Sequence, residues 1–149
     1  MFIYPPDAFE RLEYSKVIDQ IRIHCLSENG SIRVTETQVE TDLMMIEKKL
    51  RQTEEYRNIF ERGEVLPLAR FESISNDVDW LRKEGYVLDI EAIQRIYFTI
   101  SIALSIQQYI SDTERKKWIP LLSDIIQAID IDPALVSQID RVIDNNGDI

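Results

Sequence analysis

The chain has 149 residues, enough for one domain with a hydrophobic core of its own. Its 27 acidic and 17 basic residues give a formal net charge of −10, so its electrostatic field repels phosphate and disfavours autonomous binding of nucleic acid. Only 4 glycines and 5 prolines are present, too few for many tight hairpins, and this composition favours helices over strands.

The sequence indicates a reducing compartment and no membrane segment. Cys25 is the single cysteine, so no internal disulfide can form, and a lone thiol is typical of a cytoplasmic protein. The first residues lack the basic segment and apolar stretch of a secretion signal, and no run of about 18 uncharged apolar residues occurs. We therefore expect a cytoplasmic protein.

Three helices are predicted before residue 63. Ser15 is expected to cap the first, whose apolar residues recur at spacings of three and four until the run at 27–30 interrupts them. After a short second helix, Thr41 and Asp42 open a third of about 20 residues, and Gly63 ends it. The buried side of this long helix is expected to carry Leu43, Ile46, Leu50, Ile59 and Phe60.

A loop is predicted over 63–75, because Gly63 supplies a helix stop and Pro67 lacks a backbone donor. On this interpretation the loop joins two helical halves, 1–63 and 75–144. Both halves are expected to belong to a single domain that spans the whole chain.

The second half is predicted to open with a short helix that Ser75 or Asn76 caps and Gly85 ends. Asp89 then caps the most apolar helix of the chain, over 90–110. We expect this helix to be the most buried element. One of its faces carries the residues expected at the centre of the core, which are Ile96, Ile100 and Leu104.

Two further helices are predicted near the end of the chain. The segment 111–118 reads as a loop, after which Pro120 fits the first turn of a helix. Pro133 begins another helix, which is expected to run to about Asp144.

The Asn146-Gly147 pair that follows is a strong signal for a hairpin turn, but only two residues come after it. We therefore expect the chain to be truncated at this turn. Taken together, the patterns predict an all-α fold, an irregular multi-helix bundle of about six or seven helices.

No spacing of residues indicates catalysis, a metal or a cofactor. His24 is the only histidine, which favours a structural or solvent-edge role, and Cys25 lies on the apolar side of its helix, where a small buried side chain is the usual interpretation. No phosphate-cradling glycine loop is present. Asp130 and Asp132 lack the glycine and terminal glutamate of a calcium loop and are interpreted as capping residues.

Two acidic pairs satisfy half of a magnesium motif. Glu10 with Glu13, and Glu61 with Glu64, match the Glu-x-x-Glu part of the pattern found in helical nucleotide pyrophosphatases that resemble the MazG group. The second part requires a glutamate followed three residues later by aspartate, and no such pair exists in this chain. The pairs are therefore interpreted as solvated carboxylates.

Arg115, Lys116 and Lys117 form the longest unmixed basic run, beside Trp118. Three charges in a predicted loop are weak against a net charge of −10, so this run is at most a weak nucleic-acid contact. No residue is assigned to catalysis, to a cofactor or to a metal.

Several phrases of the sequence resemble the N-terminal region of the second branch of the MutS family, whose members lack the mismatch-reading and connector domains. They span nearly the whole chain and are FERLEYSKVIDQI, CLSENG, TDLMMIEKKLRQTEEYRNIFERGEVLPL, EGYVLDIEAI and IDRVIDNNGDI. Each is a pattern of helix packing and turns and none is a catalytic signature. One departure is Val39 and Glu40 before Thr41, where the family leads us to expect a proline.

The resemblance implies a non-catalytic core and lever segment of a dimeric ATPase that acts in mismatch repair or recombination control, coupling clamp movement to nucleotide state. The ATP-binding motifs, and any nuclease domain, would lie in the remaining domains, which would also contact DNA or the ribosome. The alternative is a free-standing helical adaptor that binds a partner protein through an exposed apolar groove. A small helical hydrolase is disfavoured by the missing motifs.

Overall fold

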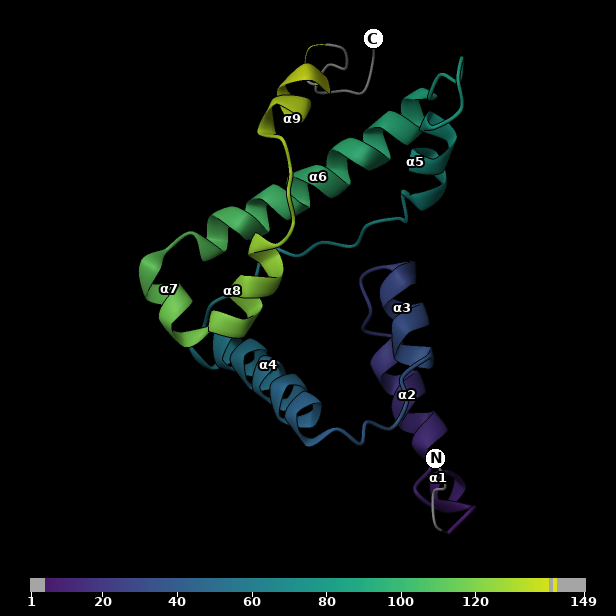
Figure 1. Cartoon of the computed structure of the whole chain (residues 1–149), viewed down its shortest axis with the longest axis vertical. Helices are drawn as coiled ribbons and strands as arrows, with labels where there is room; N and C mark the ends of the chain where they lie inside the picture. Colours follow the sequence, from purple (N-terminus) through teal and green to yellow (C-terminus); the bar gives the residue numbers. More distant parts are fainter. Residues whose placement is uncertain (1–4, 140, 142–149) are drawn as a thin grey trace. The chain divides into compact units, whose positions relative to one another are not determined.

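The computed structural model describes residues 5–139 and 141, and within them every regular element is an α-helix (Figure 1). The all-α prediction is confirmed, with nine helices in these residues in place of the six or seven expected. They are α1 (Ala8–Arg11), α2 (Tyr14–Arg22), α3 (Glu28–Thr35), α4 (Leu43–Glu61), α5 (Ser75–Leu81), α6 (Ile90–Ile110), α7 (Thr113–Trp118), α8 (Pro120–Gln127) and α9 (Pro133–Ile139).

The chain forms two compact units, Met1–Val39 and Glu40–Ile149. The sequence placed the division of the helical halves later, in the loop that follows Gly63. That loop stays with the second unit because Leu66, near its start, packs against the core of that unit. The boundary instead falls in the irregular segment that precedes α4.

The first unit consists of α1, α2 and α3, and α2 packs against both of the others. The predicted Ser15 cap is wrong, because α2 already begins at Tyr14 and its N-cap is Glu13, held in the left-handed region at φ 51°. Ser27 does not merely interrupt the chain: its hydroxyl accepts a hydrogen bond from the Gly30 amide at 3.1 Å and caps α3. None of the residues of these three helices is buried.

Helix α4 has the predicted ends. Asp42 caps it by accepting a hydrogen bond from the Met45 amide at 3.1 Å, and Gly63 follows it at φ 71°, a left-handed conformation that glycine adopts without strain. The predicted buried side is mostly wrong. Ile59 is buried and Ile46 half-buried, but three of the expected residues are exposed, namely Leu43, Leu50 and Phe60.

Helix α5 begins at Ser75 and has no side-chain cap, so the predicted cap by Ser75 or Asn76 is wrong. An ion pair fastens this short helix to α6. The guanidinium of Arg95 donates from Nε and Nη2 to the two carboxylate oxygens of Asp77, at 3.1 and 2.9 Å. Gly85 lies in the turn between the two helices at φ 77°.

Helix α6 has the predicted bounds, and Asp89 caps it by accepting a hydrogen bond from the Ala92 amide at 2.7 Å. It is the longest helix of the described residues, yet no helix among them is both long and apolar enough to cross a membrane.

The fully buried cluster lies at the C-terminal end of α6, not at its centre. It contains Ile59 of α4, Ile110 of α6 and Ile119 just before α8. Of the residues expected at the centre of the core, Ile96 is buried but Ile100 and Leu104 are only half-buried. The cluster forms at this end because α7 and α8 turn back along α6 there and α8 also packs against α4.

The segment predicted as a loop after α6 is instead the helix α7, which Asp112 caps. Pro120 occupies the first turn of α8 as predicted. Asp132 accepts a hydrogen bond from the Ala134 amide at 2.8 Å, in keeping with its predicted capping role. The predicted extension of the last helix to Asp144 and the Asn146-Gly147 turn lie outside the described residues.

The buried cluster makes a testable prediction about stability. Ile59→Ala should lower the free energy of unfolding by about 2–5 kcal/mol, because it removes buried methyl groups and leaves a cavity. Leu50→Ala on the same helix is the matched control, since Leu50 is 64% exposed and its loss should change stability by less than about 0.5 kcal/mol. Urea denaturation measures both, and equal effects would contradict this placement of the core.

Candidate functional site

The basic run that the sequence singled out lies on α7. The N-cap carboxylate of Asp112 accepts hydrogen bonds from the amides of Glu114 and Arg115, at 2.8 and 3.2 Å. The helix presents Lys116 and Lys117 to solvent, while Arg115 is half-buried. Lys117 pairs with Glu114 one turn earlier, at 2.5 Å. The run is therefore ordered, and part of its positive charge is already compensated.

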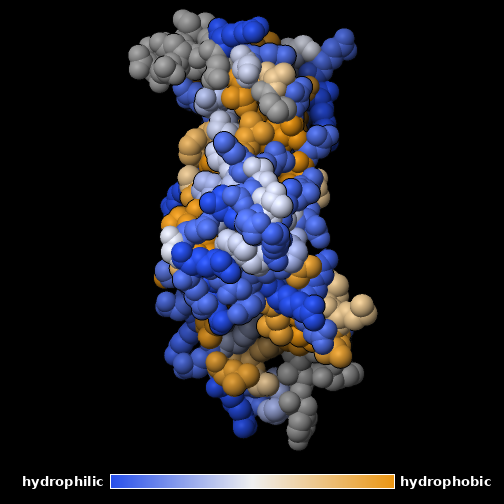
Figure 2. Space-filling model, turned by 90° about the vertical axis from the view of Figure 1, so that its left-hand side faces the viewer, coloured by the Kyte–Doolittle hydropathy of each residue, from blue (hydrophilic) through white to orange (hydrophobic). Residues whose placement is uncertain are grey.

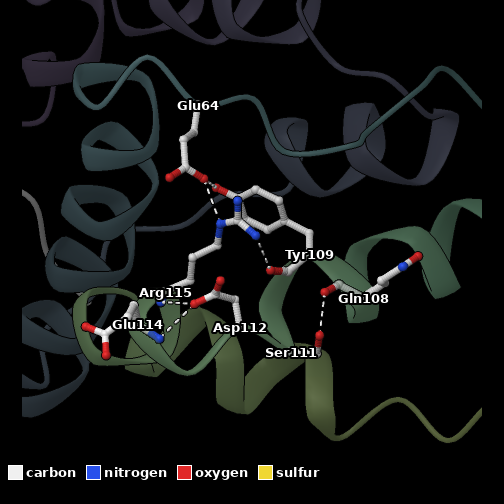
Figure 3. A network of polar contacts seen from close by, with 7 residues as sticks. All are labelled: Glu64, Gln108, Tyr109, Ser111, Asp112, Glu114 and Arg115. Atoms are coloured by element: carbon white, nitrogen blue, oxygen red, sulfur yellow. Dashed lines mark hydrogen bonds and ion pairs between the residues drawn. The ribbon is translucent and has the colours of Figure 1, made fainter.

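Arg115 points inward, into a network that joins three segments (Figure 3). Its Nε donates to Glu64 Oε2 at 2.7 Å, and its Nη1 donates to the carbonyl oxygen of Tyr109 at 3.1 Å. The guanidinium carbon also lies 4.3 Å from the centre of the Tyr109 ring. The Tyr109 hydroxyl donates to the same Glu64 oxygen at 2.9 Å. Glu64 thus ties the loop after α4 to the end of α6 and to α7.

The hydrogen bonds and burial in this network determine the protonation states of Glu64 and Tyr109. Hydrogen bonds from Arg115 and then from Tyr109 lower the pKa of the Glu64 carboxyl below its ordinary value of 4.5. Burial, reinforced by the hydrogen bond to Glu64, raises the pKa of Tyr109 to about 12. At neutral pH the carboxylate is charged and the phenol neutral. Neither group has a pKa near 7, where general acid and base catalysis is most effective.

The arrangement is therefore suited to holding helices together. Arg115 uses its Nε donor, one Nη1 donor and one face of its guanidinium on internal partners. Of the three predicted contact residues, Lys116 and Lys117 are exposed and Arg115 is half-buried. A neighbouring contact also connects the end of α4 to α7, because the guanidinium of Arg62 lies 4.4 Å from the centre of the Trp118 ring.

A second polar contact, which sequence reasoning missed, sits beside the buried cluster. Glu55 of α4 is only 8% exposed, and its two carboxylate oxygens accept hydrogen bonds from the amides of Leu121 and Leu122, at 3.1 and 2.9 Å. Amides in the first turn of a helix have no backbone acceptor within the helix, and the N-cap residue of α8, Ile119, has no side-chain oxygen that could accept from them. Glu55 supplies the acceptors instead. One sequence signal could have indicated this contact: α8 starts at Ile-Pro and has no Ser, Thr, Asp or Asn at its N-cap, so its first amides need an acceptor from elsewhere.

The remaining candidates stay apart from one another. His24 is exposed, and the Cys25 thiol is half-buried and donates to the Ile21 carbonyl oxygen at 3.7 Å. Glu13 pairs with Lys16 and Glu61 with Arg57, at 2.6 and 3.1 Å. Among residues 5–139 and 141, no three or more His, Cys, Asp or Glu side chains gather where a metal ion could bind.

The second unit also carries an apolar groove of about 340 Å³ between α5, α6 and α9. It is lined by Leu81 of α5, Leu88 of the following turn, Ile93 and Ile96 of α6, and Leu135, Gln138 and Ile139 of α9. Elsewhere too, apolar side chains interrupt the hydrophilic surface, as the orange areas of Figure 2 show.

Comparison of the chain with protein-family models, with curated proteins and with solved structures gives no match.

The Glu64 network makes a prediction about pH. Because the folded-state pKa of Glu64 is lowered, its contribution to stability is fully present above about pH 4.5 and is lost as pH falls through the folded value. Glu64→Gln should therefore be less stable than the parent protein at neutral pH, and the difference should shrink in acid. Urea denaturation across this range measures it. Glu61→Gln, which removes only a surface pair with Arg57, is the control, and a Glu64→Gln deficit that persists unchanged into acid would contradict the assignment.

Glu55 makes a prediction about helix docking. Glu55→Ala leaves two amides of α8 without acceptors in a buried place and should lower the free energy of unfolding by about 1.5–3 kcal/mol. Hydrogen exchange should show the largest loss of protection in α8. Glu54→Ala on the same helix, which removes only an exposed pair with Arg57, should cost less than about 1 kcal/mol. Unchanged protection of α8 in Glu55→Ala would refute this role.

Proposed function

We propose that this chain is a non-catalytic core and lever segment of a larger MutS-like ATPase, which acts on DNA in mismatch repair or recombination control. In that role the helices transmit movement of a clamp to the nucleotide state of a dimeric parent. The parent's other domains would bind ATP and would contact DNA or the ribosome, and the place of action would be the cytoplasm.

The observation that carries this proposal is the imbalance between buried and exposed apolar side chains. In the described part of the second unit only five apolar residues are buried, whereas 18 large apolar side chains are exposed. Scattered exposed apolar residues are normal, but a surface this rich in them next to so small a core is typical of a segment that other protein covers. A lever inside a larger machine has such neighbours.

The sequence segments that resemble the MutS family support the same proposal because they contain helix caps and turns. TDLMMIEKKLRQTEEYRNIFERGEVLPL contains the Asp42 cap, the whole of α4 and the turn at Gly63. EGYVLDIEAI contains the turn at Gly85 and the Asp89 cap of α6. The resemblance therefore falls on residues that determine where helices begin and end, as expected for a mechanical framework rather than a reactive site.

The alternative is a free-standing adaptor, which the apolar groove between α5, α6 and α9 favours. The two hypotheses differ in what the reading frame encodes after Ile149. A phosphate-binding loop of the form G-x-x-x-x-G-K-[ST] downstream supports the MutS-type parent. A stop codon directly after Ile149 would overturn it in favour of the adaptor.

The proposal also predicts how the isolated chain behaves toward DNA. Near physiological salt it should bind duplex DNA weakly or undetectably, because non-specific affinity depends on cations that neutralise phosphates and the net charge here is −10. Fluorescence anisotropy with a labelled duplex at two salt concentrations measures this. A salt-sensitive submicromolar complex would contradict it, and loss of that complex in Lys116→Glu but not in Lys48→Glu would locate the contact on α7.

A further inference from the structure

Helix α9 packs less closely on the second unit than the helices that meet at the buried cluster. Its main contact is with α6, and the irregular segment 128–132 connects it to α8 (Figure 1). No side chain of residues 134–139 is buried, since Val136 and Ile139 are half-buried and Leu135 is 41% exposed. By contrast, Ile119 at the start of α8 is fully buried.

The contact between α9 and α6 is incompletely filled. Both helices line the apolar groove of about 340 Å³, α6 with Ile93 and Ile96 and α9 with Leu135, Gln138 and Ile139. Side chains that border a hollow lose the dispersion contacts that close packing would give them. Apolar contact therefore stabilises the position of α9 less than it stabilises the buried cluster.

Polar contacts do not compensate for this loose packing. Among the described residues, no hydrogen bond or ion pair joins a side chain of 134–139 to another helix. A bond to α6 occurs just before the helix, where Nε2 of Gln107 donates to the carbonyl oxygen of Ile129 at 2.6 Å. The bond between Asp132 and the Ala134 amide is local to the first turn. The chain is thus fastened to α6 at the base of α9, and residues 134–139 are held there by apolar contact.

We propose that α9 is a displaceable cover of α6, fastened at its base by Gln107, which opens and closes while the buried cluster stays folded. A helix of seven residues is not stable in water by itself, so α9 unfolds whenever it leaves α6. Local openings of this kind need less free energy than global unfolding. Each opening uncovers the groove-lining side of α6, where Ile96 is only 9% exposed in the closed form. The chain's own conformation therefore sets how much apolar surface it presents, whatever the parent protein is.

Hydrogen exchange of the unmodified full chain tests the opening directly. We expect the amides of α9 to exchange at least about tenfold faster than those of α8, at a rate that changes little in low urea, because a local opening exposes little surface. The amides of α8 should exchange only through global unfolding and therefore with a steep dependence on urea. Equal rates and equal urea dependence in the two helices would show that α9 belongs to the cooperative core and would end the proposal.

Thiol labelling shows whether the opening uncovers α6. In a Cys25→Ser background, Ile96→Cys places a reporter thiol on the covered side of the helix. Ile110→Cys is the matched control, because it is the same change on the same helix but lies in the buried cluster. We expect a thiol reagent to label position 96 at least about tenfold faster than position 110. Equal labelling rates would contradict the proposal, and the exchange measurement decides the question without either substitution if a variant does not fold.

The bond from Gln107 to Ile129 is tested in the same assay. Gln107→Ala frees the base of α9, so the helix returns to α6 less often, and labelling at position 96 should rise by about threefold or more while labelling at position 110 stays within about twofold. Gln108→Ala is the matched control, because it keeps the carbonyl oxygen that accepts from Ser111. Equal effects of the two variants would refute the fastening at Gln107. None of these results depends on the reading frame beyond Ile149, so this proposal and the proposed function fail separately.

Discussion

The buried carboxylate of Glu55 at the first turn of α8 is the interaction on which the second unit depends. Helix α8 starts at proline and has no capping side chain of its own, so its next two amides require an acceptor from elsewhere. Glu55 supplies both oxygens. Removing a carboxylate from water costs several kcal/mol, and the two charge-assisted bonds together with the positive end of the helix dipole offset that cost.

This contact also determines where the core forms. Glu55 lies one helical turn before Ile59, so the carboxylate that holds α8 brings Ile119 and the side chains that follow it onto Ile59 and Ile110. The fit is incomplete, because the hydroxyl of Ser123 is buried without a hydrogen-bond partner. A buried polar group without a partner lowers the free energy of unfolding by about 1–3 kcal/mol. The two hydrogen bonds from the start of α8 to Glu55 therefore matter more for keeping this helix in place. The Glu64 network then closes the same end of α6 from the other side.

The sequence predicts those features that depend on neighbours along the chain. The all-α class, the caps at Asp42 and Asp89 and the stop at Gly63 follow from bonds between residues three or four positions apart. Ile59 and Ile96 were correctly predicted to be buried, but the position of the core and the polar contacts were missed because their partners are distant. Glu55 is separated from Leu121 by 66 positions and Glu64 from Arg115 by 51, so no local pattern reveals that these carboxylates are engaged. For the same reason Arg115 was predicted to be a possible nucleic-acid contact, and the centre of the core was predicted at the middle of α6 rather than at its C-terminal end.

The distribution of polar and apolar contacts bears on function. Both polar anchors of the second unit lie at the end of α6 where α4, α7 and α8 meet, and the fully buried cluster is there too. The other half of α6 packs against α9, is joined to α5 by one ion pair and is flanked by an open apolar groove. Ala92 and Ile96 are buried in this half, whereas the fully buried cluster lies at the opposite end of the helix, at Ile110. In the proposed lever role, this asymmetry would link whatever contacts the first half of α6 to the helices packed at its last turn.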